Sequence, residues 1–244
     1  MQQEHLRLID QIAGLDREWH GAGSVSRDVL LAIARHCERI GGFRHSAETG
    51  AGRTTLLFSH LSDDHVVFAL DAGESLSQTQ RSPLLQTERV RFVEGPTQKT
   101  LPRYEFDRTF QAVLIDGPHG YPFPDLEYYY FYPQLAPGGL LIIDDIQIPS
   151  IGRMLDIVRA DPMFEFIELV GTTAFLGRTD APAIDPCSDS WWLQGYNRAH
   201  YERVTRQPNA NLSGRFLRRV SRLTPKVIKD SLPDRIKSRL LKRM

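Results

Sequence analysis

The stretch Glu48-Thr49-Gly50-Ala51-Gly52-Arg53-Thr54 decides the fold of this 244-residue chain. It follows a short candidate strand at residues 43–47 and opens a helical segment at residues 54–61. Two glycines at this spacing let the backbone turn tightly and approach a ligand closely, because neither carries a Cβ atom. The first turn of the following helix offers free N–H groups to such a ligand. A Gly-x-Gly pair also occurs in plain tight turns, so the surrounding pattern has to distinguish a binding loop from a simple turn.

Short apolar runs alternate with helical segments after this loop. The runs are residues 66–70, 90–93, 112–115 and 140–143, followed by a closing pair at 164–170 and 173–176. Helical spacing marks residues 125–135, which Ala136-Pro137-Gly138-Gly139 closes, and residues 152–159. Continuous apolar runs separated by helices are typical of a mostly parallel sheet that is covered on both faces. Together with residues 43–47, they predict an α/β, Rossmann-like sheet of seven strands that ends in an antiparallel pair.

The first of these strands is unusually polar. Residues 43–47 read Phe43-Arg44-His45-Ser46-Ala47. A buried strand accommodates Arg44 and His45 only if they are paired or lie at the surface of the sheet.

Acidic residues follow three of the strands. Asp71, Asp116 and the pair Asp144-Asp145 each come directly after an apolar run. Ligands of parallel sheets bind beyond the carboxyl ends of the strands, so these acids are expected to form one rim at the binding edge. An acid in this position can also be the N-cap of the next helix, and that alternative stays open for each of them.

The details of the glycine loop favour one class of nucleotide. Asp71 lies 19 residues after Gly52, where a carboxylate can accept hydrogen bonds from both hydroxyls of a ribose. Thr55 stands at the place of the third glycine of the dinucleotide fingerprint, and the lysine of the phosphate loop is absent. The loop therefore suits a nucleoside ligand without a pyrophosphate better than NAD or ATP.

Three motifs, in this order, resemble those of the class I S-adenosylmethionine-dependent methyltransferases. Glu48-Thr49-Gly50-Ala51-Gly52 looks like the first motif of that family. Ile115-Asp116-Gly117-Pro118-His119-Gly120-Tyr121 through Asp125 resembles the "DG-x-H-x-Y…D" segment of a bacterial O-methyltransferase group. Pro137-Gly138-Gly139-Leu140-Leu141-Ile142-Ile143-Asp144-Asp145 resembles the strand that follows it there. The resemblance covers about residues 40–180.

The resemblance implies S-adenosylmethionine as the cofactor. By it, Glu48, Gly50 and Gly52 lie against the methionine and ribose part. Asp71 binds the ribose hydroxyls, and Gly95 to Thr97 border the adenine. The full set of expected cofactor-binding residues is Glu48, Thr49, Gly50, Ala51, Gly52, Thr54, Asp71, Ala72, Gly95, Pro96, Thr97 and Asp116.

Methyl transfer to a hydroxyl requires that the hydroxyl loses its proton. Asp116, Asp144 and Asp145 offer the hard oxygen ligands that Mg²⁺ prefers, and acids at these places bind a divalent ion in metal-dependent relatives. His119, whose unperturbed pKa is about 6.5, is a candidate base on the same loop as Asp116. The alternatives are that Asp116 orients the methionine amino group, that Asp144-Asp145 caps a turn, and that His119 only packs the loop.

The composition is that of a globular protein with an unusual tail. Residues 1–202 carry 17 Lys and Arg against 28 Asp and Glu, whereas residues 203–244 carry 13 against two. Apolar spacing in the tail predicts basic amphipathic helices, which can lie on an anionic membrane surface or remain solvated. No apolar run approaches the roughly 18 residues that span a bilayer, and the N-terminus lacks the pattern of a secretory signal. The two cysteines, Cys37 and Cys187, suggest neither a disulfide framework nor a zinc site.

These observations define the expected organisation and function. Residues 1–42 are expected to form an N-terminal helical cap, residues 43–180 the S-adenosylmethionine-binding domain, and residues 181–244 a C-terminal extension. The expected function is O-methylation of a sugar or another small polar metabolite, assisted by Mg²⁺, in the cytoplasm. The expected partner is a small-molecule acceptor rather than nucleic acid. Peripheral membrane contact through residues 203–244 and a homo-oligomer are left open. The alternative is a non-catalytic binding module with the nucleotide fold that docks to a membrane or partner through its basic tail.

Overall fold

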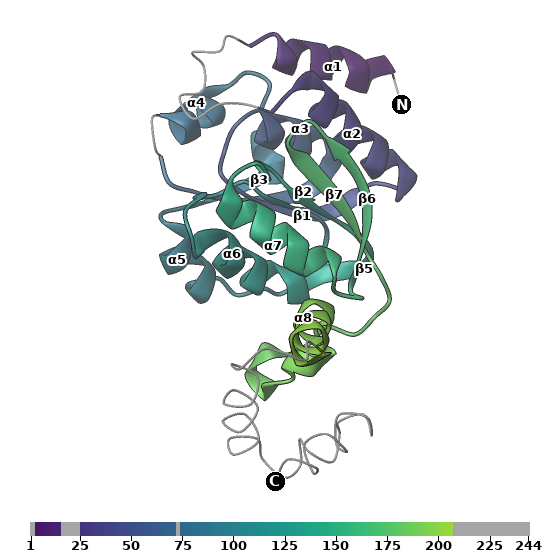
Figure 1. Ribbon diagram of the computed structural model, residues 1–244. Helices are drawn as coiled ribbons and strands as arrows, with labels where there is room; N and C mark the ends of the chain where they lie inside the picture. The colour runs from purple at the N-terminus through teal and green to yellow at the C-terminus, as the bar shows by residue number, and fades with distance from the viewer. Residues whose placement is uncertain (1–2, 16–24, 72–73, 207–244) are drawn as a thin grey trace. The chain divides into compact units, whose positions relative to one another are not determined.

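Seven strands form a single sheet in this computed structural model, which describes residues 3–15, 25–71 and 74–206. The sheet has the order β3-β2-β1-β4-β5-β7-β6 (Figure 1). The strands are β1 (Phe43–Thr49), β2 (Ser62–Ala69), β3 (Val90–Glu94), β4 (Phe110–Ile115), β5 (Leu135–Ile143), β6 (Phe164–Val170) and β7 (Thr173–Arg178). Strands β1 to β5 are parallel, and β7 runs antiparallel to both β5 and β6. The predicted mostly parallel, seven-stranded sheet is confirmed.

Helices cover both faces of the sheet, as Figure 1 shows. The α-helices are α1 (Gln3–Ala13), α2 (Arg27–Arg39), α3 (Arg53–Leu61), α4 (Ser75–Arg81), α5 (Thr97–Thr100), α6 (Phe123–Phe131), α7 (Pro149–Arg159) and α8 (Gly195–Arg206). Short 3₁₀ turns are η2 (Thr87–Arg89), η3 (Leu101–Arg103), η4 (Tyr132–Gln134), η5 (Pro186–Ser188) and η6 (Trp191–Leu193). Helices α1, α2 and α3 lie on one face, and α5, α6 and α7 lie on the other.

The central strands are apolar throughout because alternate side chains enter two different cores. In β4, Ala112 and Leu114 pack under α1, α2 and α3, whereas Val113 and Ile115 pack under α6 and α7. All four are at most 3% exposed. Full burial of one such aliphatic side chain contributes about 1.5–3 kcal/mol. The continuous apolar runs in the sequence are therefore a consequence of helices on both faces.

The boundaries of α2 agree with the capping signals in the sequence. The Ser26 hydroxyl accepts a hydrogen bond from the Val29 amide at 3.4 Å. At the other end Gly41 and Gly42 have φ angles of +84° and +103°, and the Gly42 amide donates to the Cys37 carbonyl at 2.9 Å. Left-handed glycines of this kind end a helix without the strain that a Cβ atom would add.

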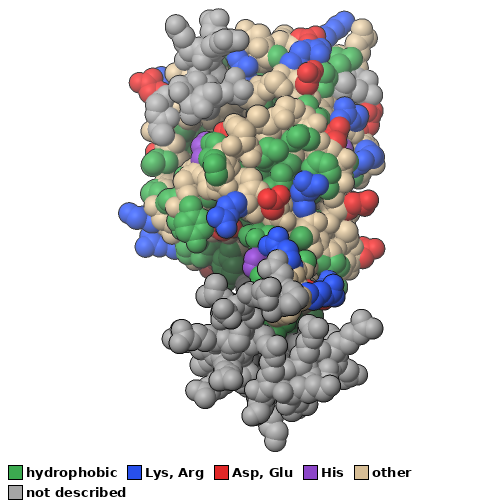
Figure 2. Space-filling model, in the orientation of Figure 1, with side chains coloured by type: hydrophobic (Ala, Val, Ile, Leu, Met, Phe, Trp, Pro, Cys, Tyr) green, Lys and Arg blue, Asp and Glu red, His purple; other side chains and the backbone are tan. Residues whose placement is uncertain are grey.

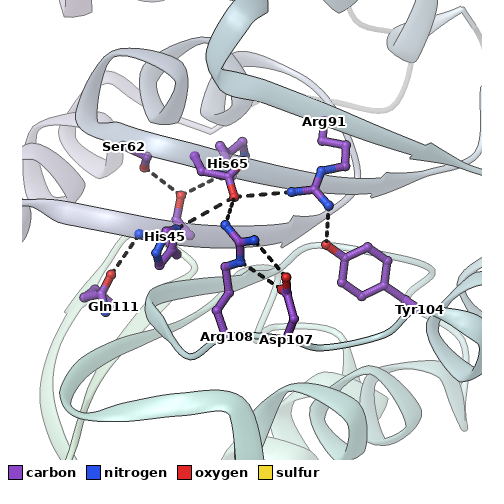
Figure 3. A network of polar contacts seen from close by, with 10 residues as sticks. His45, Ser62, His65, Arg91, Tyr104, Asp107, Arg108 and Gln111 are labelled. Carbon is purple, nitrogen blue, oxygen red and sulfur yellow. Dashed lines mark hydrogen bonds and ion pairs between the residues drawn. The ribbon is translucent and has the colours of Figure 1, made fainter.

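The polar first strand lies in the middle of the sheet, between β2 and β4. Arg44 is exposed, and His45 is half-buried with its Nδ1 3.8 Å from Asp64 Oδ2. The same carboxylate is 3.4 Å from Arg91 and 3.1 Å from Arg108 (Figure 3). The amino half of β1 is therefore accommodated by exposure of one side chain and by an ionic network around the other.

Several element boundaries differ from the sequence prediction, most of all at the start of β2 and between α6 and β5. Strand β2 begins at Ser62, directly after α3, although the apolar run starts only at residue 66. Residues 62–65 are polar, so the apolar pattern did not identify them as part of the strand. The helix predicted over residues 125–135 ends at Phe131, and residues 135–143 are all part of β5. Pro133 lacks the amide hydrogen that would continue the helix, and a register irregularity opposite Phe110 accommodates the Pro-Gly-Gly segment within the strand.

The chain divides into two compact units, Met1–Ser190 and Trp191–Met244. In the first unit, α1 and α2 share one core with the sheet. In the second, the Trp191 ring packs on Tyr201 with centroids 5.3 Å apart. The basic helices expected beyond Arg206 lie outside the described residues, as does most of the charge asymmetry. On the face drawn in Figure 2, charged side chains of both signs are interspersed with apolar ones. Among residues 3–15, 25–71 and 74–206, no helix has the length and apolarity to cross a bilayer.

Candidate active site

The loops that follow β1 to β5 meet at one edge of the sheet, because these strands are parallel. Strand β1 continues to β2 on one side and neighbours β4 on the other, so the strand order changes direction between β1 and β4. A crevice at such a switch point is the usual ligand site of an open α/β sheet. The glycine loop after β1 and Asp116 after β4 border this switch point.

The glycine loop is held closely against the end of β4. Gly50 has a φ of +85°, and its amide donates to the Phe68 carbonyl at 3.0 Å. A Cβ atom at this position would overlap the backbone carbonyl oxygen of Asp116. Only glycine satisfies both conditions, which explains the first glycine of the motif.

Thr55 connects the two ends of the glycine loop by hydrogen bonds. The Gly52 amide donates to Thr55 Oγ1 at 3.0 Å, and the Thr55 hydroxyl donates to Glu48 Oε1. Glu48 is completely buried. Its Oε1 also lies 3.2 Å from His65 Nε2, while its Oε2 has no hydrogen-bond partner among the described residues. The threonine in place of a third glycine thus ties the loop to its own acidic residue. Thr54 and Ala51 are also buried.

Asp71 follows β2 and caps α4. Its Oδ1 accepts from the amides of Leu76 at 3.1 Å and Ser77 at 3.3 Å, and its Oδ2 accepts from the Ser77 hydroxyl. The hydrogen bond from the Ser77 side chain is the main cause that lowers the pKa of this carboxyl. The helix cap, which the sequence left open, is therefore present. Carboxylate oxygens keep further acceptor capacity, so the cap does not exclude ribose hydroxyls. Ala72 lies outside the described residues.

The segment after β3 bends sharply at its glycine. Gly95 has a φ of +135°, and its amide donates to the Ala69 carbonyl at 2.9 Å. The Pro96 carbonyl accepts from the amides of Lys99 and Thr100 and so starts α5. Thr97 is 3% exposed, and its hydroxyl has no hydrogen-bond partner in the part of the chain that the structure describes. All three residues expected at the adenine lie at this edge of the sheet.

Asp116, His119 and Asp145 converge at the ends of β4 and β5. His119 Nε2 lies 3.6 Å from Asp116 Oδ1 and 3.2 Å from Asp145 Oδ2. One ligand atom from each residue falls within 4.8 Å of the other two. Asp145 has a φ of +56°, an uncommon conformation for a residue other than glycine. Asp144 is buried, and its Oδ1 accepts from the Thr173 hydroxyl at 2.6 Å. The structure thus groups His119, rather than Asp144, with the other two acids.

The acid and the histidine of this cluster influence each other's ionisation. Desolvation, together with the nearby Asp144 and Asp145, raises the pKa of Asp116 to about 7, although His119 opposes the shift. Interaction with the Asp116 carboxylate raises the pKa of His119. The Asp116 carboxylate and the protonated His119 imidazole therefore stabilise each other.

Glu127 is a site residue that the sequence analysis missed. It lies on α6 and is completely buried. Its Oε2 accepts from the Thr49 hydroxyl at 2.8 Å, and its carboxyl group occupies the space where a side chain at Gly117 would lie. Burial raises its pKa to about 7. The motif drew attention to Asp125 instead, which is only half-buried.

A periodicity argument could have found Glu127. Pro124, Glu127 and Phe131 are the buried residues of α6, and their spacing of three and four marks one helix face. An acid on an apolar face is expected to have a buried partner.

Comparisons with known proteins agree with this architecture. Residues 47–146 match the family model of a methyltransferase domain. No curated protein sequence matches the chain. An O-methyltransferase from Bacillus cereus, solved in complex with SAH, has a TM-score of 0.51 at 19% identity over 73% of this chain and 92% of its own.

Two further solved structures have similar values. TomG from Streptomyces achromogenes, an O-methyltransferase in complex with SAM, has a TM-score of 0.53 at 14% identity, over 73% of this chain and 91% of its own. A methyltransferase from Geobacter sulfurreducens has a TM-score of 0.53 at 15% identity, over 74% and 91%. At these identities the likeness shows the fold. The match of residues 47–146 to a methyltransferase domain and the fold around them are therefore consistent with the class I S-adenosylmethionine-dependent O-methyltransferase-like family whose motifs the sequence resembles.

Proposed function

We propose that this chain transfers the methyl group of S-adenosylmethionine to a hydroxyl of a sugar or another small polar metabolite. One observation carries the proposal. The glycine loop touches the backbone of Asp116, and Asp116 belongs to the cluster with His119 and Asp145. A cofactor on that loop therefore adjoins groups that accept a proton or hold a cation.

The cofactor is assigned to the switch point between β1 and β4. Gly50 and Gly52 give the methionine and ribose part close access to the backbone, and Glu48 lies beneath them. Asp71 accepts hydrogen bonds from the ribose hydroxyls, and Gly95 to Thr97 border the adenine. The cofactor-bound O-methyltransferases of Bacillus and Streptomyces with the same fold support this assignment.

The reaction is a displacement at carbon. Bound S-adenosylmethionine would supply an electrophilic sulfonium methyl group to the acceptor oxygen and would leave as S-adenosylhomocysteine, which retains the electron pair of the broken C–S bond. His119 takes the hydroxyl proton, and the carboxylates of Asp116 and Asp145, which lie beside its Nε2, stabilise the resulting imidazolium. Positioning of the two substrates supplies much of the acceleration.

The same three side chains also fit a divalent cation. His119 Nε2 makes no hydrogen bond of good geometry within the described residues, although two carboxylates lie beside it. A nitrogen with two oxygens suits Mn²⁺ as well as Mg²⁺. Asp116, His119 and Asp145 would hold the ion, which would lower the pKa of the acceptor hydroxyl. His119 would then be a ligand, and the proton would leave to water or a neighbouring carboxylate.

The proposal is tested in two steps. Calorimetry is expected to show binding of S-adenosylmethionine and S-adenosylhomocysteine to the purified chain. Transfer of a labelled methyl group is then followed over a panel of sugars and other hydroxyl compounds. Absence of cofactor binding would refute the proposal, and binding without any turnover would favour a non-catalytic binding module instead.

A further inference from the structure

A line of buried polar side chains crosses the sheet beneath the glycine loop. Ser62 Oγ lies 2.6 Å from Ser46 Oγ, which lies 2.7 Å from His65 Nδ1 (Figure 3). His65 Nε2 then lies 3.2 Å from Glu48 Oε1, and Glu48 continues through Thr55 to the Gly52 amide. The line is composed of Ser62, Ser46, His65, Glu48, Thr55 and Gly52. It links the amino end of β2 to the loop that is assigned to the cofactor.

The donors and acceptors of this line are consistent with one another. A neutral imidazole accepts at one ring nitrogen and donates at the other. The Ser62 hydroxyl can donate to Ser46, and the Ser46 hydroxyl can then donate to His65 Nδ1. This arrangement leaves the ring hydrogen of His65 on Nε2, which lies 3.2 Å from Glu48 Oε1 as a close polar contact without the geometry of a hydrogen bond among the described residues. His65 is thereby the group that connects two halves of the line.

Ser46, His65 and Glu48 together contain the residue types of a nucleophilic triad, but their burial excludes that use. All three are 0% exposed, so no substrate can reach the Ser46 oxygen. The His65 ring is stacked on Phe58 of α3, with centroids 4.8 Å apart and an interplanar angle of 11°. It is fixed between β1 and α3, the two elements that the glycine loop joins.

Glu48 is the member of the line whose carboxyl group is incompletely hydrogen-bonded. It is a buried carboxylate whose Oε2 has no hydrogen-bond partner in residues 3–15, 25–71 and 74–206. A buried charge is costly unless its neighbours satisfy it. Thr55 and His65 both approach the other oxygen, Oε1. They fix the orientation of the carboxyl group and therefore the direction in which Oε2 points.

We propose that His65 is a positioning residue for cofactor binding. His65 orients Glu48 and, through Glu48 and Thr55, the backbone of Gly52. The inference rests on the proposed function, since it assumes that the glycine loop binds S-adenosylmethionine. It adds a residue that none of the sequence motifs contains.

The test compares His65→Gln with His65→Asn by calorimetry with S-adenosylhomocysteine. The amide of glutamine extends to the place of the imidazole Nε2 and keeps the contact with Glu48. The amide of asparagine reaches only the place of Nδ1 and keeps the contact with Ser46. Both substitutions remove the aromatic stacking on Phe58. We expect the asparagine variant to bind about tenfold more weakly than the glutamine variant, because it loses the polar contact with Glu48 that glutamine keeps.

Ser62→Ala is the matched control, because it removes only the far end of the line, and its affinity is expected to equal that of the wild type. Equal affinities of the two His65 variants would overturn the inference while wild-type binding still supported the proposed function. Failure of the wild type to bind would instead refute the proposed function.

A second measurement avoids the variants. We expect the imidazole ¹⁵N resonances of His65 in the wild-type chain to shift when S-adenosylhomocysteine is added. Unchanged His65 resonances at saturation would overturn the inference even if both variants failed to fold.

Discussion

Thr49 Oγ1 accepts a hydrogen bond from the backbone amide of Asp116, with 3.0 Å between oxygen and nitrogen. The last register pair between β1 and β4 is Glu48 with Leu114, so this bond continues the pairing where the two strands separate. The Thr49 hydroxyl in turn donates a hydrogen bond to Glu127 Oε2 at 2.8 Å. One hydroxyl therefore joins β1, β4 and α6 at the switch point, directly beneath the acid of the proposed site.

Replacement of Thr49 by valine tests this connection. Thr49→Val keeps the shape of the side chain and leaves the partly buried Asp116 amide and a buried oxygen of Glu127 without their partner. We expect a loss of about 1–3 kcal/mol in the free energy of unfolding, measured by urea denaturation. Thr49→Ser retains the hydroxyl and is expected to lose much less. Equal stability of the valine and serine variants would show that the hydroxyl does not connect the elements.

Glu127 predicts how stability changes with pH. Burial raises the pKa of its carboxyl from 4.5 in the unfolded chain to about 7 in the fold. The folded state therefore binds the proton more tightly, so this group lowers stability as the pH rises through that window, and its full penalty is present above pH 7. Glu127→Gln removes the penalty while its amide oxygen can still accept from Thr49. The variant is expected to be about 1–3 kcal/mol more stable than the wild type at pH 8, with a smaller difference at pH 5. A stability difference that does not depend on pH would contradict this account.

Gly50 predicts a specific loss of cofactor binding. Gly50→Ala imposes a positive φ on alanine and also a collision with the Asp116 carbonyl. Gly41 is a matched control, because its φ of +84° is nearly the same and an added Cβ would meet nothing within 4 Å. Both variants are expected to lose about 1 kcal/mol or more from backbone strain. Only Gly50→Ala is expected to weaken binding of S-adenosylhomocysteine by tenfold or more, as calorimetry would show. If both variants bind equally well, the close approach of Gly50 to β4 is unimportant for the cofactor.

Asp71 has two assigned roles that substitutions can separate. Asp71→Ala removes both the cap of α4 and the proposed ribose ligand, whereas Ser77→Ala removes a partner of the cap alone. We expect Asp71→Ala to reduce affinity for S-adenosylhomocysteine about tenfold, and Ser77→Ala to leave it within twofold or so of the wild type. A similar loss in both variants, measured by calorimetry, would mean that Asp71 acts only by capping the helix.

The two adjacent acids after β5 predict where a cation would bind. Asp145 faces His119, whereas Asp144 is engaged by Thr173. Asp145→Asn is expected to weaken Mn²⁺ binding, followed by electron paramagnetic resonance, and Asp144→Asn to have a smaller effect. The opposite order would place the cation on Asp144.

Chelation addresses the role of the same cluster in turnover. Methyl transfer that is lost with EDTA and restored by Mg²⁺ or Mn²⁺ would assign Asp116, His119 and Asp145 to a metal. Turnover that is indifferent to EDTA would assign His119 to the role of base, with Asp116 and Asp145 as its partners.

Much of the architecture follows from local pattern. Runs of apolar residues with both faces covered identify β4 and β5, and Ser26 and Gly41-Gly42 give the ends of α2. The glycine loop is also a local feature, since its turn requires only residues near Gly50. The prediction was wrong where a polar segment extends a strand, as in residues 62–65, and where Pro133 ends a helix early. For residues 62–65 the pairing with β1 decides the conformation, and a neighbouring strand is not visible in the local pattern. Pro133, by contrast, is a local signal that the helix prediction passed over.

The sequence by itself determined the succession of strands along the chain, the binding edge and the acids that lie along it. Only the tertiary structure decided what each acid does. Asp71 caps α4, Asp144 binds Thr173, and Asp145 faces His119, because each partner belongs to another element. Glu127 meets Thr49 from 78 positions away, and His65 meets Ser46 across 19. Such contacts depend on how elements pack, and the packing of a chain brings together residues that no local propensity or motif spacing connects.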